Sequence, residues 1–410
     1  MSAFRPVLSL IAAVWFVQLS GGMLGVLTPL GLADMEVESL GVGVVAGLHA
    51  AGFMIGAYIA PRLIGTLGNI RMFAAAAALT AVGALMQGLW QSELGWALIR
   101  FVQGATFAAM FAFAEAWLGR AAPVEHRGSV LGAYNVAAKA ALLMGPVLFL
   151  QTAALSPQNY IWTGLFLAAA LVPICVTRQQ EPRRVAVARL PVMRMIKITP
   201  SAVFGVFIAG IVNTGTMSLL PIYISTISGG ENAVAAAALA YAVANAGGLL
   251  SQWPAGRLSD RFERRFVIAA LAAMSGLMAI ALAAFGSMLE MKVILVLLFL
   301  WGAGSLSFYG VCVAHGVDRV SDDDLTALMS TLLLVWAAGS VIGPVAAGGA
   351  MRSGLGPAGL FALAATGLFA LTVAMLIRGI GRQGVPDTDQ TEWQPVLPAG
   401  LPGGELDPRT

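Results

Sequence analysis

Long apolar stretches separated by short polar segments dominate the pattern along the chain. They do not alternate between apolar and polar positions, as the strands of a membrane barrel do. Most reach the ~20 residues that a helix needs to cross the hydrocarbon core of a bilayer. Breaking them at charges, Pro and Gly predicts twelve spans, at 7–33, 41–61, 70–91, 94–118, 128–152, 159–177, 200–227, 233–254, 266–286, 291–315, 325–350 and 357–378.

Composition excludes the main alternatives to a membrane protein. Of 410 residues, 59% are hydrophobic and only 10% are charged, whereas a soluble domain carries about a quarter of charged residues. The apolar fraction is also too high for a disordered chain. Two cysteines, Cys175 and Cys312, lie inside apolar runs and cannot form a disulfide framework. We therefore predict an all-α protein embedded in the lipid bilayer.

The distribution of Lys and Arg predicts the orientation of the spans. If the N-terminus is inside, 19 of the 23 Lys and Arg fall in cytoplasmic segments, Lys292 and Arg352 fall outside, and Arg100 and Lys139 lie within spans. Positive residues in short loops stay on the cytoplasmic side. Both termini are therefore predicted to be cytoplasmic, in the inner membrane of a bacterium. The net charge of +3 reflects this topology and indicates no nucleic-acid partner.

An internal repeat divides the predicted spans into two groups of six. Gly104 and Gly302 open similar small-residue stretches, and Gly145 and Gly343 each precede a proline near the end of the next span. Both separations are 198 residues. Parallel repeats of this kind are typical of two-bundle transporters with a substrate site between the bundles, near the membrane midplane.

The predicted organisation has four parts. An N-terminal six-helix bundle covers 1–177 and a C-terminal six-helix bundle covers 200–380. A basic cytoplasmic linker, 178–199, joins them. The end of the chain, 381–410, is rich in Pro, Gly and acidic residues and is predicted to be a disordered cytoplasmic tail, because it cannot bury a core.

Two motifs resemble those of the major facilitator superfamily. The segment GRLSDRFERR at 256–265 is similar to its loop signature G-x-L-x-D-R-x-x-R-R, and RFVQG at 100–104 is similar to its R-x-x-Q-G motif. The runs GIVNTGTMSLLPIY, SQWPAGRLSDRF, FYGVCVAHGVDRV and WAAGSVIGP resemble the YcaD-like branch of bacterial transporters. The resemblance covers the chain to about residue 380. It implies the major facilitator fold, with a substrate-carrying rather than an enzymatic role.

The loop signature predicts a cytoplasmic gate. Asp260 is expected to meet the positive end of a neighbouring helix, at the start of the fifth span near Gly128, so that one bundle latches onto the other. The equivalent first-half position is Gly65, so the latch is asymmetric. The alternative is a loop that only sets topology. The predicted gate comprises Asp260, Arg257, Arg261, Arg264, Arg265, Arg71 and Arg127.

Three charges within spans are candidates for function, because a charge in the bilayer is costly unless it is paired or hydrated. Arg100 either takes part in transport or bonds carbonyls of neighbouring helices. Glu115 either binds protons or, as we favour, pairs with Arg71 or Arg127 at the gate. Lys139 falls mid-span, with Asn135 one turn before it. It is predicted to line the cavity and contact substrate or a coupling proton, the alternative being a pair between helices.

Weaker candidates are polar positions within other spans. Each can instead form a hydrogen bond between helices. His49 is the exception, because imidazole titrates near neutral pH and suits coupling or binding as well as structure. These positions are Gln18, His49, Asn213, Thr214, Asn245, Gln252 and Tyr309.

The residues predict a secondary active transporter that moves a small organic solute by alternating access. Protons are the expected coupling ion. We expect a monomer without a metal or other cofactor. One alternative is a copper carrier, since Cys312 and His315 share a helix face and soft ligands suit copper. Another is a membrane enzyme or assembly factor, for which the acidic run 322–324 is the densest reactive group. That run is simpler to interpret as a helix cap.

Overall fold

The computed structural model describes residues 7–121, 127–148, 152–153, 155–176, 192–230, 232–321, 324–381 and 393. Within these ranges the chain is helical and contains no β-strand. Eleven helical segments are long and apolar enough to cross a membrane. The remaining predicted span corresponds to α5, which packs beside α1 and α11. The prediction of an all-α membrane protein is confirmed.

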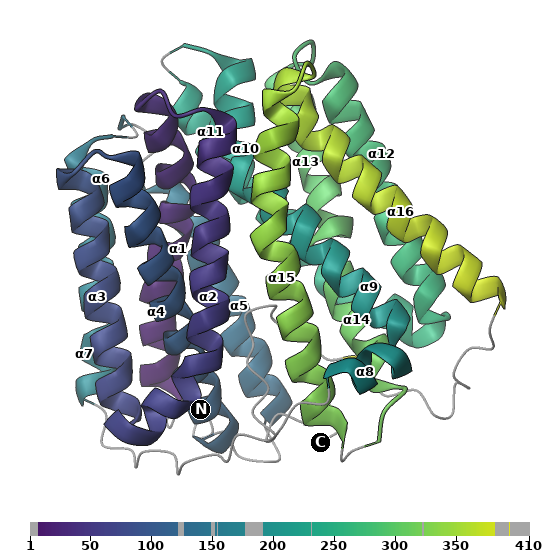
Figure 1. Ribbon diagram of the computed structural model, residues 1–410, viewed down its shortest axis with the longest axis horizontal. Helices are drawn as coiled ribbons and strands as arrows, with labels where there is room; N and C mark the ends of the chain where they lie inside the picture. Colours follow the sequence, from purple (N-terminus) through teal and green to yellow (C-terminus); the bar gives the residue numbers. More distant parts are fainter. Residues whose placement is uncertain are drawn as a thin grey trace.

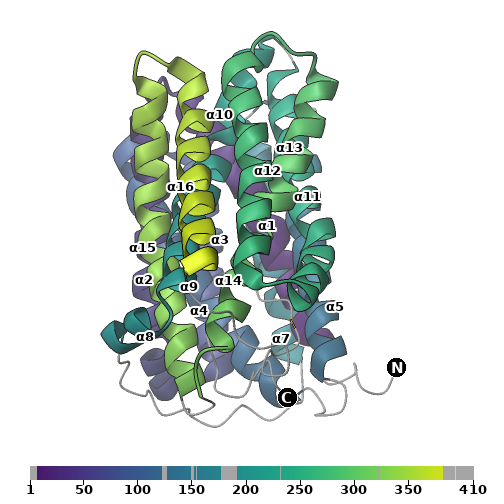
Figure 2. The ribbon, with the colours of Figure 1, turned by 90° about the vertical axis from the view of Figure 1, so that its right-hand side faces the viewer.

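The helices form two groups that lie side by side in Figure 1; in Figure 2 the C-terminal group lies in front of the N-terminal one. The N-terminal half contains α1 (Leu8–Asp34), α2 (Ser39–Leu67), α3 (Asn69–Leu89), α4 (Glu93–Ala121), α5 (Arg127–Val147), α6 (Pro157–Ala169) and α7 (Leu171–Val176). The C-terminal half contains α9 (Pro200–Ala209), the π-helix η3 (Gly210–Thr214), α10 (Gly215–Ser228), α11 (Ala233–Arg261), α12 (Arg264–Phe285), α13 (Met291–Ser305), α14 (Phe308–Val317), α15 (Leu325–Arg352) and α16 (Gly359–Gly381).

Several predicted elements differ in detail from the structure. The sixth span is divided into α6 and α7, and the fifth ends at Val147 rather than at 152. A short helix, α8 (Val192–Ile198), lies within the predicted linker; residues 177–191 of that linker are outside the described ranges. Apolar periodicity marks where a chain is buried or meets lipid, but it does not register short breaks in a helix.

The internal repeat is visible as equivalent helix contacts in the two halves. A Cβ at Gly104 of α4 would collide with the backbone of α2, and one at Gly302 of α13 would collide with the backbone of α11. Likewise Gly145 of α5 lies against α1, and Gly343 of α15 lies against η3. Small residues let helices pack closely inside a membrane, where the hydrophobic effect does not drive helix association. The glycines 198 residues apart therefore perform the same packing role in each half.

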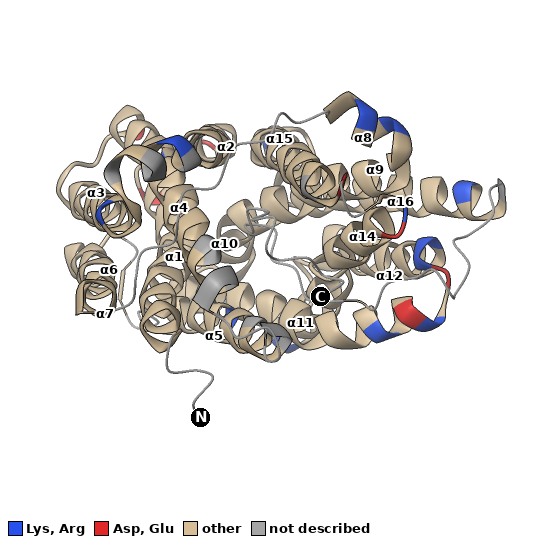
Figure 3. Cartoon of the chain, turned by 90° about the horizontal axis from the view of Figure 1, so that it is seen from below, with Lys and Arg blue, Asp and Glu red and all other residues tan. Residues whose placement is uncertain are grey.

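Charged residues distinguish the two ends of the molecule. We call the lower end in Figure 1 the basic end and the opposite one the acidic end. Figure 3 views the basic end, where Lys and Arg occupy helix termini around the rim. At the acidic end lie Asp34, Glu36, Glu38, Glu93 and Glu290, all at helix termini or in loops.

Close contact between α2 and α15 joins the halves at the acidic end. A Cβ at Gly43 would collide with the carbonyl of Pro344, and one at Gly348 would collide with that of Ser39. The Ser39 hydroxyl donates a hydrogen bond of 3.1 Å to the Gly348 carbonyl. The outer parts of the two halves thus meet backbone to backbone.

Candidate functional site

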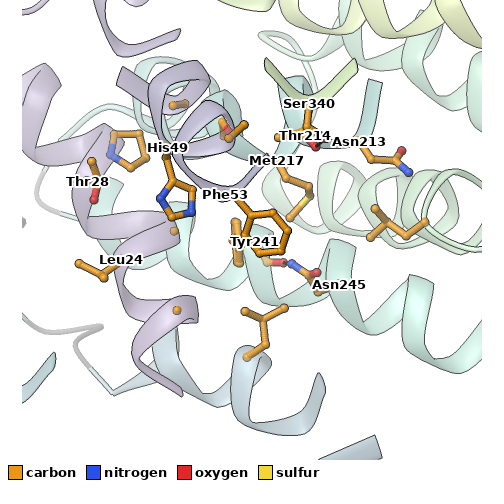
Figure 4. A pocket seen from close by; sticks show the side chains of 18 of the residues that line it. Leu24, Thr28, His49, Phe53, Asn213, Thr214, Met217, Tyr241, Asn245 and Ser340 are labelled. Atoms are coloured by element: carbon orange, nitrogen blue, oxygen red, sulfur yellow. Dashed lines mark hydrogen bonds between the residues drawn. The ribbon is translucent and has the colours of Figure 1, made fainter. Parts of the chain in front are cut away.

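A cavity of about 400 Å³ lies between the two halves. This volume is within the range of small-molecule binding sites. Its lining comes from α1, α2, α4 and α5 on one side and from η3, α10, α11, α14 and α15 on the other. The polar lining residues are Gln18, Thr28, His49, Arg100, Lys139, Asn213, Thr214, Ser218, Tyr241, Asn245, Gln252, Tyr309 and Ser340. Several of them are drawn in Figure 4.

Most of the predicted substrate and proton candidates line this cavity: Gln18, His49, Arg100, Lys139, Asn213, Asn245 and Tyr309. The structure therefore brings together side chains from seven different predicted spans. Asn135 is buried on α5 but does not belong to the lining. Glu115 lies on α4, and its side chain is outside the described residues. The roles of all these residues in binding or coupling stay predictions.

Arg100 and His49 are connected where α4 crosses α2. The His49 Nδ1 donates to the backbone carbonyl of Arg100 over 3.1 Å. Because a carbonyl can only accept, a neutral His49 ring keeps its lone pair on Nε2. The Arg100 Nη1 donates to Gln103 Oε1 over 3.1 Å, whereas the buried Nε has no hydrogen-bond partner within the described protein. The guanidinium is thus only partly satisfied by protein groups.

Lys139 bridges the two halves. Its Nζ donates a hydrogen bond of 3.0 Å to Oε1 of Gln252, so that α5 is linked to α11 across the cavity. This mid-span lysine therefore lies at the cavity and contacts a neutral amide rather than a carboxylate. Among the described residues that line this cavity there is no Asp or Glu.

The π-helix η3 shapes the opposite wall. Such single turns widen the helix locally and are frequent at functional sites. Here the Asn213 Nδ2 donates to the Ser305 carbonyl over 2.8 Å, and the Ser305 hydroxyl donates back to Asn213 Oδ1. Thr214 and Ser340 share a hydrogen bond of 2.9 Å. These bonds fix the irregular turn to α13 and α15.

Some lining residues were not predicted from the sequence. The Tyr241 hydroxyl lies so close to α1 that a Cβ at Gly25 would be 2.7 Å from it. Phe53 and Trp336, from opposite halves, stack edge to face with ring centroids 6.2 Å apart. Tyr241 could have been found, because it precedes Asn245 by one turn on the same helix face. An aromatic residue in an apolar span is otherwise indistinguishable from one that faces lipid.

A protein-family model matches most of this chain. The model described as Major Facilitator Superfamily matches residues 10–305 and 202–401, which together cover most of the sequence. The chain belongs to the Major Facilitator Superfamily. Its predicted membership is thereby confirmed.

Relatives within the superfamily are transporters. The MFS-type transporter YcaD of Escherichia fergusonii is 28% identical over 344 residues, covering 83% of this chain and 87% of the relative. YcaD of Salmonella enteritidis is 27% identical over the same length, with the same coverage. These matches confirm the predicted resemblance to the YcaD-like branch and the prediction that the protein is not an enzyme.

Solved structures show the same fold. The nucleoside transporter NupG superposes with a TM-score of 0.76 at 12% identity, covering 92% of this chain and 100% of the other. The D-xylose-proton symporter gives a TM-score of 0.72 at 12% identity, with coverage of 93% and 98%. The Escherichia coli fucose:proton symporter FucP, as an asparagine-to-alanine variant, gives a TM-score of 0.60 at 15% identity, with coverage of 92% and 100%. The predicted major facilitator fold is thereby confirmed.

The loop signature of this facilitator forms ion pairs inside the C-terminal half. Arg264 donates from Nε to Asp318 Oδ2 over 2.6 Å, and both side chains are 2% exposed. Its Nη1 lies 3.4 Å from Asp260 Oδ1. Sequence reasoning missed Asp318, although it follows α14 directly in a segment typical of the family. The latch from Asp260 to the start of α5 stays a prediction, because no contacts of Arg127 or Gly128 are described.

Other predicted gate residues occupy varied positions. Arg265 pairs with Glu263 and donates to the Arg378 carbonyl, which ties α12 to α16. Arg257 stacks on Trp253 with its guanidinium carbon 3.7 Å from the ring centroid. Of the other predicted gate residues, Arg71 and Arg261 are exposed, and the side chain of Arg127 is outside the described residues.

The two residues that motivated the copper alternative have protein partners. The Cys312 Sγ packs on Gly205 of α9. The buried His315 has its Nδ1 3.2 Å from the Arg319 Nη1, an arrangement in which the ring nitrogen accepts. Within the described residues there is no group of three or more His, Cys, Asp or Glu that could hold a metal ion. No observation favours a copper site here.

Proposed function

We propose that this protein is a secondary active transporter that moves a small organic solute across the bacterial inner membrane by alternating access, with protons as the coupling ion. The observation that carries the proposal is the cavity between the halves, lined by polar side chains from both and bridged by Lys139 and Gln252. In the superfamily fold, such a site is reached from either side as the bundles rock.

The proposal includes an orientation and a domain division. The basic end is cytoplasmic, in keeping with the retention of positive residues on that side. The moving bodies are 1–177 and 200–380, joined by the linker 178–199, and the transporter works as a monomer. The closed seam between α2 and α15 at the acidic end then faces away from the cytoplasm.

Proton coupling is assigned to His49. Its Nδ1 is engaged by the Arg100 carbonyl, so a proton arriving from the cavity would be taken up on Nε2. Two solved structures of the same fold are by name proton symporters, for D-xylose and for fucose. They support coupling to protons as a mode of action compatible with this fold.

Transport by purified protein in liposomes tests the proposal. A panel of metabolites is offered with and without a pH gradient, and protein-free liposomes serve as the control. At least one solute is expected to accumulate only in protein-containing vesicles, and more strongly with the gradient. If no solute moves and none raises the melting temperature of the protein, the transporter proposal fails.

His49→Asn tests the assigned coupling residue. The asparagine amide can keep the hydrogen bond to the Arg100 carbonyl but cannot take up a proton near neutral pH. We expect downhill exchange of the solute to continue while accumulation driven by the pH gradient is lost. Gradient-driven accumulation equal to that of the wild type would assign coupling to another group.

A further inference from the structure

We propose that the transported solute is an organic anion, an inference that rests on the proposed transport function. The cavity holds two cationic side chains, Arg100 and Lys139, and no Asp or Glu among its lining residues. Every carboxylate whose side chain is described lies at a helix end or in a loop. Glu115, on the same helix as Arg100, is fifteen residues further along, or about 22 Å at 1.5 Å per residue. The cavity is therefore positively charged.

Among the described residues, only neutral groups accept hydrogen bonds from these cations. Arg100 donates to the Gln103 amide and Lys139 to the Gln252 amide. The Arg100 side chain is 9% exposed, and its Nε is buried without a partner among protein groups. A buried charge without a counter-charge is costly. A carboxylate or phosphate on the solute supplies both the missing charge and the missing acceptor, in the paired geometry that guanidinium favours.

Apolar and aromatic side chains form the rest of the wall. Leu24, Phe53, Met217, Leu306 and Trp336 all line the cavity. They exclude water from the solute and provide contact area for a hydrocarbon or ring. The favoured solute is therefore small, with one anionic group and an apolar or aromatic body, rather than a sugar or a cation.

Matched pairs of small molecules test this charge selectivity. Carboxylic acids and their primary amides, such as benzoate and benzamide, are compared for stabilisation of the purified protein and for inhibition or uptake in liposomes. We expect acids of suitable size to bind and the amides not to. Equal action of acids and amides, or transport of neutral or cationic solutes alone, would refute the anion inference while leaving the transport function intact. Failure of every solute would refute the transport function itself.

The variant Arg100→Gln adds a second measurement. Loss of a charged hydrogen-bonding partner is expected to weaken binding of the acid by about ten- to a hundredfold. Arg62→Gln, which removes an exposed guanidinium outside the cavity lining, is the matched control. A variant that binds the acid as tightly as the wild type would contradict the role of Arg100, and a loss of thermal stability without ligand would show that its role is structural.

Independently, we infer that Trp393 restrains the transporter from its basic end. This residue belongs to the predicted disordered tail, yet its side chain is buried, with 8% exposure. Its indole packs on Gly256 of α11 and on Gly310 of α14, where an added Cβ at Gly256 would overlap the ring. Gly310 also belongs to the lining of the cavity. The tail residue therefore lies at the edge of the cavity, between two helices of the C-terminal half.

Trp393 also contacts the loop signature. Its backbone N–H donates to Asp260 Oδ1 over 3.1 Å, so a tail residue engages the carboxylate that is expected to latch the halves together at this end. Docking of Trp393 and formation of the latch would compete for Asp260. We infer that the docked indole favours the arrangement seen here and slows the change to the alternative one.

Trp393→Ala tests this restraint, with Trp393→Phe as the variant that keeps a ring. We expect several-fold faster uptake in Trp393→Ala and near wild-type uptake in Trp393→Phe. Spin labels at Arg71→Cys and Phe262→Cys, both exposed positions, in a Cys175→Ser background report the separation of the halves at the basic end. Shorter separations are expected to gain population when the indole is lost. Unchanged uptake and separations, or a lower melting temperature alone, would refute the restraint.

Discussion

Lys139→Ala is expected to reduce uptake of the solute to less than about one-tenth of the wild-type rate, with normal insertion into the membrane. The substitution removes the hydrogen bond to Gln252 and one of the two positive charges at the cavity. A hydrogen bond to a charged group contributes about 1.5–3 kcal/mol, and every 1.4 kcal/mol is tenfold in affinity. Initial rates in liposomes, normalised to the amount of inserted protein, measure the effect.

Lys197→Ala is the matched control for that experiment. Lys197 is exposed on α8, away from the cavity lining, and its loss should leave uptake unchanged. Wild-type uptake by Lys139→Ala would refute the assignment of this lysine to the transport site. A fall in uptake that is matched by a fall in the amount of folded protein would instead indicate an interhelical structural role.

Gly104→Ala is expected to destabilise the protein by about 1–3 kcal/mol, the usual cost of overpacking. An added methyl group would collide with the His49 carbonyl and the Phe53 nitrogen, which are backbone atoms of α2 and cannot move alone. Gly302→Ala should behave in the same way, because its methyl group would collide with the Ala244 carbonyl. Thermal unfolding in detergent measures both variants as a lower melting temperature.

Gly132→Ala is expected not to destabilise the protein, in contrast to Gly104→Ala. No atom of the described residues lies within 4 Å of a Cβ at this position of α5, and alanine favours helix by about 0.8–1.0 kcal/mol over glycine. This variant should be as stable as the wild type or slightly more so. Equal melting temperatures for Gly104→Ala and Gly132→Ala would contradict the interpretation that the repeat glycines are there for close packing.

Much of the fold follows from local chemistry and is therefore predictable. The length of the spans and the distribution of charges can be read from short segments of sequence. The glycine repeat can also be read from the sequence, and the structure shows Gly104 and Gly302 in equivalent helix contacts. The irregular turn at 210–214 was not predicted, because its stability comes from Asn213 meeting Ser305. These residues lie far apart in the sequence, and no local pattern reports their contact.

The candidate site was predictable to a similar extent. Polar residues in spans are costly to place in lipid, so Arg100, His49 and Lys139 could be expected at a cavity. The hydrogen-bond partner of Lys139 could not be predicted, because sequence polarity alone does not show whether a lysine meets the Gln252 amide or a carboxylate. The docking of Trp393 was not predicted, because the composition of the surrounding residues indicates disorder. One indole hardly changes the mean composition of that segment.

The backbone seam between α2 and α15 has a consequence for the energy of opening. The contacts at Gly43 and Gly348 involve no interlocking side chains, and the ion pair there, Arg352 with Glu38, is exposed at 58% and 66%. Exposed ion pairs contribute only about 0–1 kcal/mol. Separating these two surfaces at the acidic end therefore leaves no buried charge unpaired. The aromatic contact between the same helices, Phe53 with Trp336, lies at the cavity. In the proposed transport cycle, these surfaces can therefore part and re-form without breaking a buried ion pair.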